Sequence, residues 1–413
     1  MIAVFVIFCA VLVWFIFQRS GSPTRTIYSS LPKHEAGGGL DKQSADMELA
    51  IRLALKEADG SAGDFEVKYK PLNASDEDGE ILPETIRRNA NIAADDSEAA
   101  VYIGDRTSSA SIASIPILSE AQLPQISPAS TRVGLTVADP TADANEPGGH
   151  YHNGYRNFVR VIPHDNIQAA ALVTLMQRDG CKRVAMINDG GDYSTGLSST
   201  MSLFRQPARV FRQAVRPNAA APIYERLAQR ARDERADCFQ YSGGNNPNTQ
   251  AIFRAFADAL PDARLYASDG VSETSFEAGT SGASGCIDAS LMVPPRDITR
   301  YPDFLGAFAK AYPAVKPPDP YAIYAYEAMR LALDAIEDSP DGSRTKILDA
   351  LRRTSNRPSP LGTYSVDDNG DTTLVDYDVS RISGCRPGAP RRAVSRPRLE
   401  RALRALSKRS ASL

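Results

Sequence analysis

The chain has 413 residues, 42% of them hydrophobic, and a formal net charge of −3. This length is enough for two or three domains with sizeable cores. From Arg386 to the C-terminus, nine Lys or Arg residues stand against one acid, so the rest of the chain is acidic. An acidic body argues against nucleic acid as a partner.

The two ends of the chain differ in composition from its middle. The first seventeen residues, MIAVFVIFCAVLVWFIF, carry no charge. That is long enough for an export signal and marginal for a membrane span. We expect residues 1–18 to be an export signal or an uncleaved membrane anchor rather than a buried core helix, and the protein to be extracytoplasmic, in the cell envelope or periplasm. Residues 386–413 predict a basic tail that is either solvated or in contact with anionic lipid.

Between residues 26 and 157, segments typical of strands and helices alternate with short links. In the helix expected over Ser44–Gly60, Met47, Ile51 and Leu55 lie on one face. The expected strands are Thr26–Leu31, Phe65–Leu72, Ala99–Gly104 and Pro124–Ser130, and the other helices are Pro83–Asp96 and Ala110–Gln122. This alternation is typical of parallel α/β units.

A second alternation of the same kind begins at Phe158 with a strand and a helix. Its further strands are Arg183–Asp189, Arg209–Val215, Asp237–Gly243 and Arg264–Gly270, and its further helices are Thr195–Gln206, Pro222–Arg235 and Asn248–Leu260. A strand over Ile287–Pro295 leaves this run, and three helices follow over Tyr301–Tyr312, Tyr321–Glu337 and Lys346–Thr354. The segment Gly362–Ile382 predicts a hairpin around Asp-Asn-Gly-Asp. The sequence therefore predicts an α/β fold with two similar parallel runs.

Patterns that indicate catalysis or cofactor binding are absent from the sequence. No GxSxG, Walker or GxGxxG motif follows a strand, and the four histidines lack metal-ligand spacing. The acidic run Asp367–Asp371 lacks the glycine and the distal glutamate of a calcium loop, which favours a turn. We therefore expect a protein that is not an enzyme and that holds no cofactor and no metal.

Two clusters of small hydroxyl residues follow predicted strands, in YIGDRTSSAS (residues 102–111) and ISPAST (residues 126–131). Ligands of open parallel sheets lie at the carboxyl ends of the strands. Ser108 and Ser109 begin a helix, whose free N–H groups favour an anion, and Thr131 adds a donor from the neighbouring strand end. Together these groups predict a site for a small carboxylate. Capping of the helix by serine is the alternative.

The opposite end of such a ligand needs a group of opposite charge. Asp269, in YASDG, follows the last strand of the second run. Its carboxylate is suited to an ammonium group, or alternatively it starts a turn with Gly270. Tyr193 lies in the loop after Arg183–Asp189 and either covers the ligand or packs on that loop.

Four cysteines lie outside the apolar N-terminal segment. They are Cys181, Cys238, Cys286 and Cys385. An even number in an exported chain predicts two disulfides, for which three pairings exist. Four buried free thiols are the alternative.

Taken in order, several of these segments resemble the periplasmic leucine/isoleucine/valine-binding proteins, the type I solute-binding receptors of ABC transporters. The matching pieces are IYSSLP, AVYIGDRTSSAS, ISPASTRVGLT, FVRVIPHDNIQAAAL, KRVAMINDGGDYSTGL, YASDGVSE, YAIYAYEAMRLAL and GTYSVDDNGD. They cover roughly residues 26 to 385. The resemblance implies a type I periplasmic binding protein fold: two Rossmann-like lobes with parallel central sheets, joined by a hinge of three crossovers.

The same resemblance implies the boundaries and the function of the lobes. The first lobe comprises residues 26–157 and 293–350, and the second comprises 158–292 and 361–385. The ligand lies between them, and hinge closure around it produces the shape that an ABC permease recognises. The implied function is the binding of a small amino acid or related zwitterion or carboxylate for import. The alternative is a membrane-anchored sensor of the same fold, which an uncleaved N-terminal segment would favour.

The resemblance also assigns roles to individual residues. Ser108 and Thr131 bind the α-carboxylate, the Ala129 carbonyl binds the α-amino group, and Tyr193 covers the ligand. Asp269 pairs with the α-ammonium group, where the family has the longer glutamate, and Asn245 stands where amino-acid-binding members have an aromatic residue. The complete set of expected ligand-binding residues is Ser108, Ser109, Ala129, Ser130, Thr131, Asp165, Tyr193, Asn245 and Asp269. The sheet order of the family further implies a Cys181–Cys238 disulfide, which leaves Cys286 and Cys385 for a second one.

Overall fold

The structure is a computed structural model that describes residues 22–35, 39–205, 207–272, 276, 288–293, 302–315 and 317–383. The expected export signal or anchor (1–18), the basic tail (386–413), Cys286 and Cys385 lie outside these residues. None of the helices in the described ranges is long and apolar enough to cross a membrane.

The first lobe is built around a six-stranded sheet in the order β2-β3-β1-β4-β5-β6. Its strands are β1 (Thr24–Leu31), β2 (Ser61–Ala62), β3 (Phe65–Asn73), β4 (Ala99–Ile103), β5 (Gln125–Ser127) and β6 (Phe158–Arg160). Successive side chains of β1 point to opposite faces, so Ile27 and Tyr28 enter different cores. The helices α2 (Lys42–Glu57), α11 (Ala322–Glu337) and α12 (Arg344–Arg352) cover the Ile27 face, and α3 (Pro83–Asp95) and α4 (Ser108–Glu120) cover the Tyr28 face.

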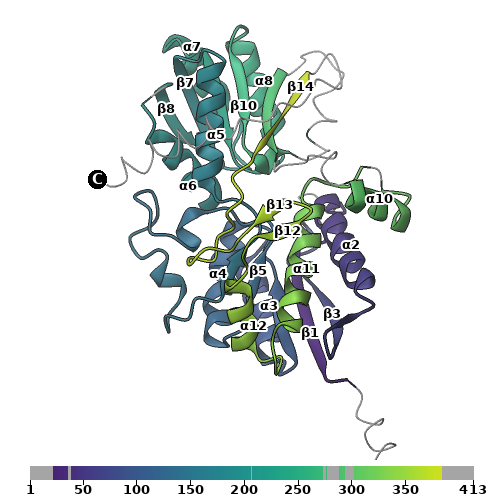
Figure 1. Cartoon of the computed structure of the whole chain (residues 1–413). Coiled ribbons are helices and arrows are strands. Elements are labelled where there is room, and N and C mark those ends of the chain that lie inside the picture. The colour runs from purple at the N-terminus through teal and green to yellow at the C-terminus, as the bar shows by residue number, and fades with distance from the viewer. Residues whose placement is uncertain are drawn as a thin grey trace, which may run out of the picture.

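The second lobe repeats this plan with the sheet order β14-β11-β10-β9-β7-β8. Its strands are β7 (Arg183–Asn188), β8 (Ala208–Ala214), β9 (Cys238–Ser242), β10 (Arg264–Ala267), β11 (Asp288–Val293) and β14 (Asp378–Ser383). The helices α5 (Asp165–Arg178) and α6 (Asp192–Ser202) cover one face, and α7 (Ala221–Asp233) and α8 (Thr249–Ala259) cover the other. Figure 1 shows the two lobes stacked end to end, which confirms the predicted fold class.

The chain crosses between the two sheets three times. It passes from the first sheet to the second between β6 and β7, returns between β11 and α11, and passes again between β13 (Gly362–Tyr364) and β14. A short helix, α10 (Pro302–Ala311), lies on the second of these paths and packs against α2. These crossings make the residues around Arg160 and Asp371 part of the connection between the lobes.

Two predicted lobe boundaries differ from this arrangement. The sequence prediction began the second lobe at residue 158, but β6 extends the first sheet, with Gln125 of β5 opposite Phe158. It also assigned residues 361–385 to the second lobe. Leu361 and Tyr364 instead pack in the core of the first lobe with α11, and β14 joins the second sheet.

The predicted hairpin over Gly362–Ile382 is wrong in its extent. The strand β13 pairs with β12 (Arg357–Ser359), and β14 pairs antiparallel with β11. A single bridge between Val366 and Thr372 flanks the acidic turn, in which the Asp367 N–H donates to the Asp371 carbonyl at 2.8 Å. The two halves cannot continue as a hairpin because they belong to different lobes.

A disulfide joins Cys181 and Cys238 in the second lobe, with their Cα atoms 5.9 Å apart, which confirms the predicted pairing. Cys238 begins β9, which lies beside β7, and Cys181 lies two residues before β7. In the described part of the chain, one group of residues has potential metal-binding atoms close together: these two cysteines and Asp237. Both sulfurs are used by the disulfide, so this group is not a metal site.

Candidate functional site

A cavity of about 520 Å³ lies between the two lobes. From the first lobe it is lined by the loops after β3, β4 and β5 and by Tyr321, which directly precedes α11. From the second lobe it is lined by the loops after β7, β8, β9 and β10. The carboxyl ends of both parallel sheets therefore face the same space, and its volume is suited to a small molecule.

Seven of the nine residues predicted to bind a ligand line this cavity. They are Ser108, Ser109, Ala129, Thr131, Tyr193, Asn245 and Asp269. The remaining two, Ser130 and Asp165, are buried and are not part of the lining. The sequence prediction thus identified loops that meet at this cavity, but it included two residues that do not line it.

The N-terminus of α4 presents Ser108 and Ser109 to the cavity. The helix is capped by Thr107, whose side-chain oxygen accepts from the Ala110 N–H at 3.3 Å. Ser108 is therefore not the capping residue that the alternative reading required. Its Oγ accepts the Arg132 N–H at 3.2 Å, which leaves the hydroxyl proton able to be donated.

Ser130 belongs instead to a buried hydrogen-bond network around Asp105. Its Oγ donates to the Asp105 carbonyl at 3.0 Å and shares a hydrogen bond with Ser111 Oγ at 2.8 Å. The Asp105 carboxylate accepts from Ser114 at 2.6 Å and from Tyr102 at 3.1 Å. Burial raises the pKa of Asp105 to about 6, and these hydrogen bonds oppose the shift. Part of the hydroxyl-rich sequence therefore joins the ends of neighbouring strands.

Asp269 is the acid that the second lobe brings to the cavity. It begins a short 3₁₀ turn, Asp269–Val271, at the end of β10, and only 2% of its surface is exposed. The Tyr193 hydroxyl donates to Asp269 Oδ1, and the Asp269 N–H donates to Gln168 Oε1 at 3.0 Å. Burial raises the pKa of the Asp269 carboxyl. Its Oδ2 makes no hydrogen bond of 3.5 Å or less to the described residues, and the nearby Tyr321 hydroxyl opposes the rise of the pKa.

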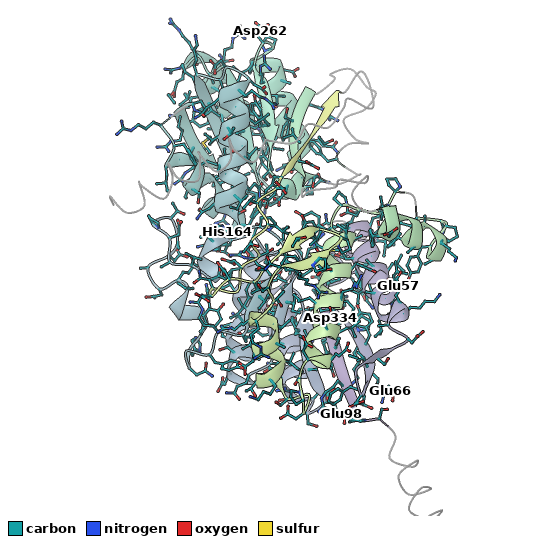
Figure 2. All side chains as sticks on the ribbon, in the orientation of Figure 1. Glu57, Glu66, Glu98, His164, Asp262 and Asp334 are labelled. Carbon is teal, nitrogen blue, oxygen red and sulfur yellow. A yellow bond between two sulfur atoms is a disulfide. The ribbon has the colours of Figure 1, made fainter. Side chains whose placement is uncertain are left out.

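Asp165 lies behind Asp269 at the start of α5. Figure 2 shows the preceding residue, His164, at the junction between the lobes. The Asp165 N–H donates to the Thr131 carbonyl at 2.8 Å, and its Oδ1 accepts from Gln168 Nε2 at 3.2 Å. Burial is the main cause that raises the pKa of Asp165 well above its ordinary value, and the charge of Asp269 adds to it.

Two lining residues carry chemistry that the sequence reading missed. Arg106, two residues before α4, forms an ion pair with Asp41 at 2.9 Å and donates to Gln43 at 3.1 Å. Tyr321 precedes α11, and its pKa is raised well above the ordinary value by burial and by the charge of Asp269. The position of Arg106 next to the hydroxyl cluster was a usable signal. Tyr321 carried none, because a tyrosine before a long apolar helix is typical of core packing.

Beside the cavity, Arg132 connects the two lobes. It follows β5, and its guanidinium donates to Glu146 at 2.8 Å through Nε and again at 2.8 Å through Nη2. Its Nη1 donates to the Asp192 carbonyl at 2.6 Å, across the cleft at the start of α6. Thr141 of the first lobe and Thr200 of the second also share a hydrogen bond of 3.1 Å.

The geometry therefore sets opposite chemical functions on the two sides of one cavity. The first lobe offers hydroxyl donors, a helix N-terminus and a guanidinium group, which attract an anionic group. The second lobe offers the buried carboxylate of Asp269, whose neighbours among the described residues are neutral hydroxyl and amide groups, and this is suited to a cationic donor. A ligand with both kinds of group would contact both lobes.

Comparison with known proteins places this arrangement among binding proteins. The model of the family described as periplasmic binding protein matches residues 36–386. The Leu/Ile/Val-binding protein BraC3 of Rhizobium johnstonii is 26% identical over 270 residues, which cover 64% of this chain and 71% of that protein.

Two solved structures share the fold. The leucine-binding protein LivK of Thermotoga maritima has a TM-score of 0.73 at 22% identity, covering 90% of this chain and 98% of its own. The branched-chain amino acid transporter substrate-binding protein LivJ of Streptococcus pneumoniae, in complex with isoleucine, has a TM-score of 0.73 at 16% identity, covering 90% of this chain and 99% of its own.

Proposed function

The chain belongs to the periplasmic binding protein family, and from this premise we propose that it is the extracytoplasmic substrate-binding protein of an ABC importer. Its ligand is a small amino acid or a related zwitterion, held in the cavity between the lobes. Its partner is an ABC permease, which recognises the closed form. The names of the relatives support this proposal because they describe binding proteins for amino acids.

The observation that carries the proposal is the pairing of Ser108 and Asp269 across one cavity. Ser108 stands at the N-terminus of α4, where backbone N–H groups and a hydroxyl proton favour a carboxylate. Asp269 supplies a buried carboxyl with one oxygen that lacks a partner among the described residues. An ammonium group at Asp269 would satisfy that oxygen and offset the cost of burying the charge.

Binding is coupled to closure because the ligand touches both lobes. Contacts made only in the closed state stabilise that state over the open one. We infer that the Arg132 bond to the Asp192 carbonyl and the Thr141–Thr200 bond contribute to closure, since each joins residues of opposite lobes. Tyr193 of the second lobe and Tyr321 of the first both line the cavity near Asp269 and would cover the ligand.

The lining combines polar side chains with apolar surface. Its polar members include Gln43, Arg106, Asn218, Asn245 and Asn246. Its apolar surface comes from Ile81, Ala129, Pro217 and Pro247 and from the rings of Tyr193 and Tyr321. The cavity therefore suits a zwitterion with either a polar or an apolar side chain.

Compounds that carry only one of the two charged groups of an amino acid test the proposal. Isothermal titration calorimetry would compare L-alanine, L-serine and L-leucine with propionate, which lacks the amine, and ethylamine, which lacks the carboxylate. We expect at least one amino acid to bind and both truncated compounds to bind at least tenfold more weakly. A panel in which propionate binds as tightly as the amino acids would refute the role of Asp269 and the zwitterion assignment.

A further inference from the structure

The proposed ammonium site uses one buried carboxyl group, Asp269, and a second one, Asp165, lies beside it. Asp165 is 1% exposed and Asp269 is 2% exposed. The Thr131 hydroxyl lies near the Asp165 carboxyl and the Tyr321 hydroxyl near that of Asp269, but neither Oδ2 atom makes a hydrogen bond of 3.5 Å or less to the described residues. Gln168 links them, because its amide group donates to Asp165 Oδ1 at 3.2 Å and its Oε1 accepts the Asp269 N–H at 3.0 Å. Two linked buried carboxyl groups require an explanation that a single ligand ammonium does not supply.

The groups around this pair do not neutralise it. The nearest arginines, Arg160 and Arg132, are each bound to another acid: Arg160 to Asp371 at 2.6 Å and Arg132 to Glu146 at 2.8 Å. His164, which precedes Asp165, is buried, and burial lowers its pKa, which favours the neutral ring. The other titratable groups that face the pair are the hydroxyls of Tyr193, Tyr321 and Tyr377, which are neutral donors.

We propose that Asp165 and Asp269 act as one unit that holds a single shared proton in the ligand-free protein and exchanges it for the ammonium group of the ligand. Two close carboxyl groups in a site of low dielectric constant do not both ionise without a cation. The pair therefore titrates as a unit, and the proton belongs to neither residue alone. This inference rests on the proposed ammonium site at Asp269 and adds Asp165 as a residue that sets its charge.

The exchange balances in protons and in charge. The free pair carries one proton and a charge of −1, and the zwitterion arrives with its ammonium already protonated. On binding, the ammonium takes the position next to Asp269, both carboxyl groups become carboxylates, and one proton leaves to the solvent. The affinity therefore rises with pH, by up to about tenfold per pH unit, as long as the free pair still holds its proton.

Infrared spectroscopy of the ligand-free protein tests whether the pair holds a proton. Infrared spectroscopy of protein carrying ¹³C-labelled aspartate would follow the carbonyl stretch of a protonated carboxyl group from pH 4 to pH 9. We expect one buried aspartic acid to stay protonated above pH 5 in addition to Asp105, and Asp165→Asn to shift its titration to lower pH. Asp233→Asn on the surface of α7 is the matched control and should leave the titration unchanged. A spectrum in which Asp105 is the only aspartic acid still protonated at pH 5, identified by its loss in Asp105→Asn, would overturn the proposal.

Calorimetry with L-alanine and L-leucine tests the exchange. Titrations in phosphate and in Tris at the same pH, which differ in ionisation enthalpy, give the number of protons released on binding. We expect about one proton from the parent protein and from Asp233→Asn, and close to none from Asp165→Asn. Binding without proton release would refute the shared proton but would still support the proposed binding of amino acids. Absence of binding by both amino acids would count against the receptor, while the infrared result would still decide the state of the pair.

Discussion

Arg132 in the first lobe donates a hydrogen bond of 2.6 Å to the backbone carbonyl of Asp192 in the second lobe. The bond lies beside the cavity, because Thr131 and Asp192 both belong to its lining. Glu146 holds the guanidinium in place through two hydrogen bonds. A side chain anchored in one lobe and bound to the backbone of the other holds the two lobes together in this arrangement, which is the closed state of the proposed binding cycle.

Arg132→Ala should therefore weaken ligand binding by favouring the open state. A hydrogen bond from a charged donor contributes about 1.5–3 kcal/mol, so the loss predicts an affinity at least tenfold lower. Calorimetry with the best amino acid of the panel measures this, and small-angle X-ray scattering follows the opening. Arg230→Ala, which removes an exposed ion pair with Glu234 on α7, is the control and should bind normally. Equal affinities of the two variants would show that the bond does not contribute to closure.

Asp269→Asn should weaken amino-acid binding at least tenfold and leave the fold intact. The substitution keeps the size of the side chain and removes the negative charge that the ammonium needs, and a buried charged contact of this kind is worth a few kcal/mol. Binding of propionate should change much less, because propionate carries no ammonium. If calorimetry shows that alanine and propionate lose affinity equally, Asp269 acts through the shape of the cavity and not through its charge.

Ser108→Ala and Thr107→Ala form a matched pair that separates ligand binding from helix capping. Thr107 also lines the cavity, but its side-chain oxygen caps α4, so its loss should cost about 1 kcal/mol of unfolding free energy and weaken carboxylate binding less than the loss of Ser108 does. Ser108 faces the cavity, so its loss should weaken binding of amino acids several-fold with a smaller effect on stability. Denaturant titration and calorimetry measure the two quantities. The reverse pattern would make Ser108 a structural residue.

Much of the fold follows from periodicity alone. A near-continuous apolar run such as that of β7, where Val184 and Ile187 enter different cores, is typical of a strand covered on both faces. The placement of β6 and the end of the predicted hairpin did not follow, because the pairing of β6 with β5 and of β14 with β11 is a long-range contact. The segment after Tyr364 carries a turn signal that is locally correct, but its last strand pairs with β11. Local patterns do not report which sheet a strand joins.

The site was predictable to the level of loops and not to the level of side chains. Strand ends followed by small or acidic residues indicated the lining correctly for Ser108 and Asp269. Ser130 belongs to the same run of hydroxyls, yet it turns toward Asp105, because consecutive residues at a strand end point in different directions. Tyr321 was missed because an isolated tyrosine before an apolar helix carries no signal of a site, whereas Arg106 was missed although it stands next to the hydroxyl cluster. Burial and hydrogen-bond partners, which decide such cases, exist only in the folded chain.

The Cys181–Cys238 disulfide should make a large contribution to stability. It closes a loop with a sequence separation of 57 residues. In the chain-entropy model a loop of this length corresponds to about 4 kcal/mol of unfolding free energy. The double variant Cys181→Ser, Cys238→Ser should show this loss in denaturant titration, and mass spectrometry of non-reduced peptides should identify the pairing in the parent protein. An unchanged denaturation midpoint would mean that the native protein does not carry this bond.

The pKa of Glu146 predicts that the contact between Glu146 and Arg132 is lost in acid. Burial alone would raise the pKa of Glu146, but hydrogen bonds from His150 and Arg132, together with the charge of Arg132, lower it from 4.5 to about 2. A carboxyl whose pKa is lower in the folded state stabilises the protein above its unfolded pKa. That stabilisation is lost as the pH falls from about 4.5 to about 2. The shift corresponds to about 3 kcal/mol at most.

The matched experiment compares Glu146→Gln with the parent protein in urea titrations at several pH values. The parent should be more stable by about 2–3 kcal/mol at pH 6, and the gap should close progressively below pH 4.5, because the parent then loses the charge that the variant already lacks. Glu234→Gln, in the exposed pair with Arg230, should differ from the parent by less than about 1 kcal/mol at every pH. A gap for Glu146→Gln that stays constant down to pH 2 would show that the glutamate acts through packing. The inference that the charge of Glu146 holds Arg132 in place for its bond to the second lobe would then be wrong.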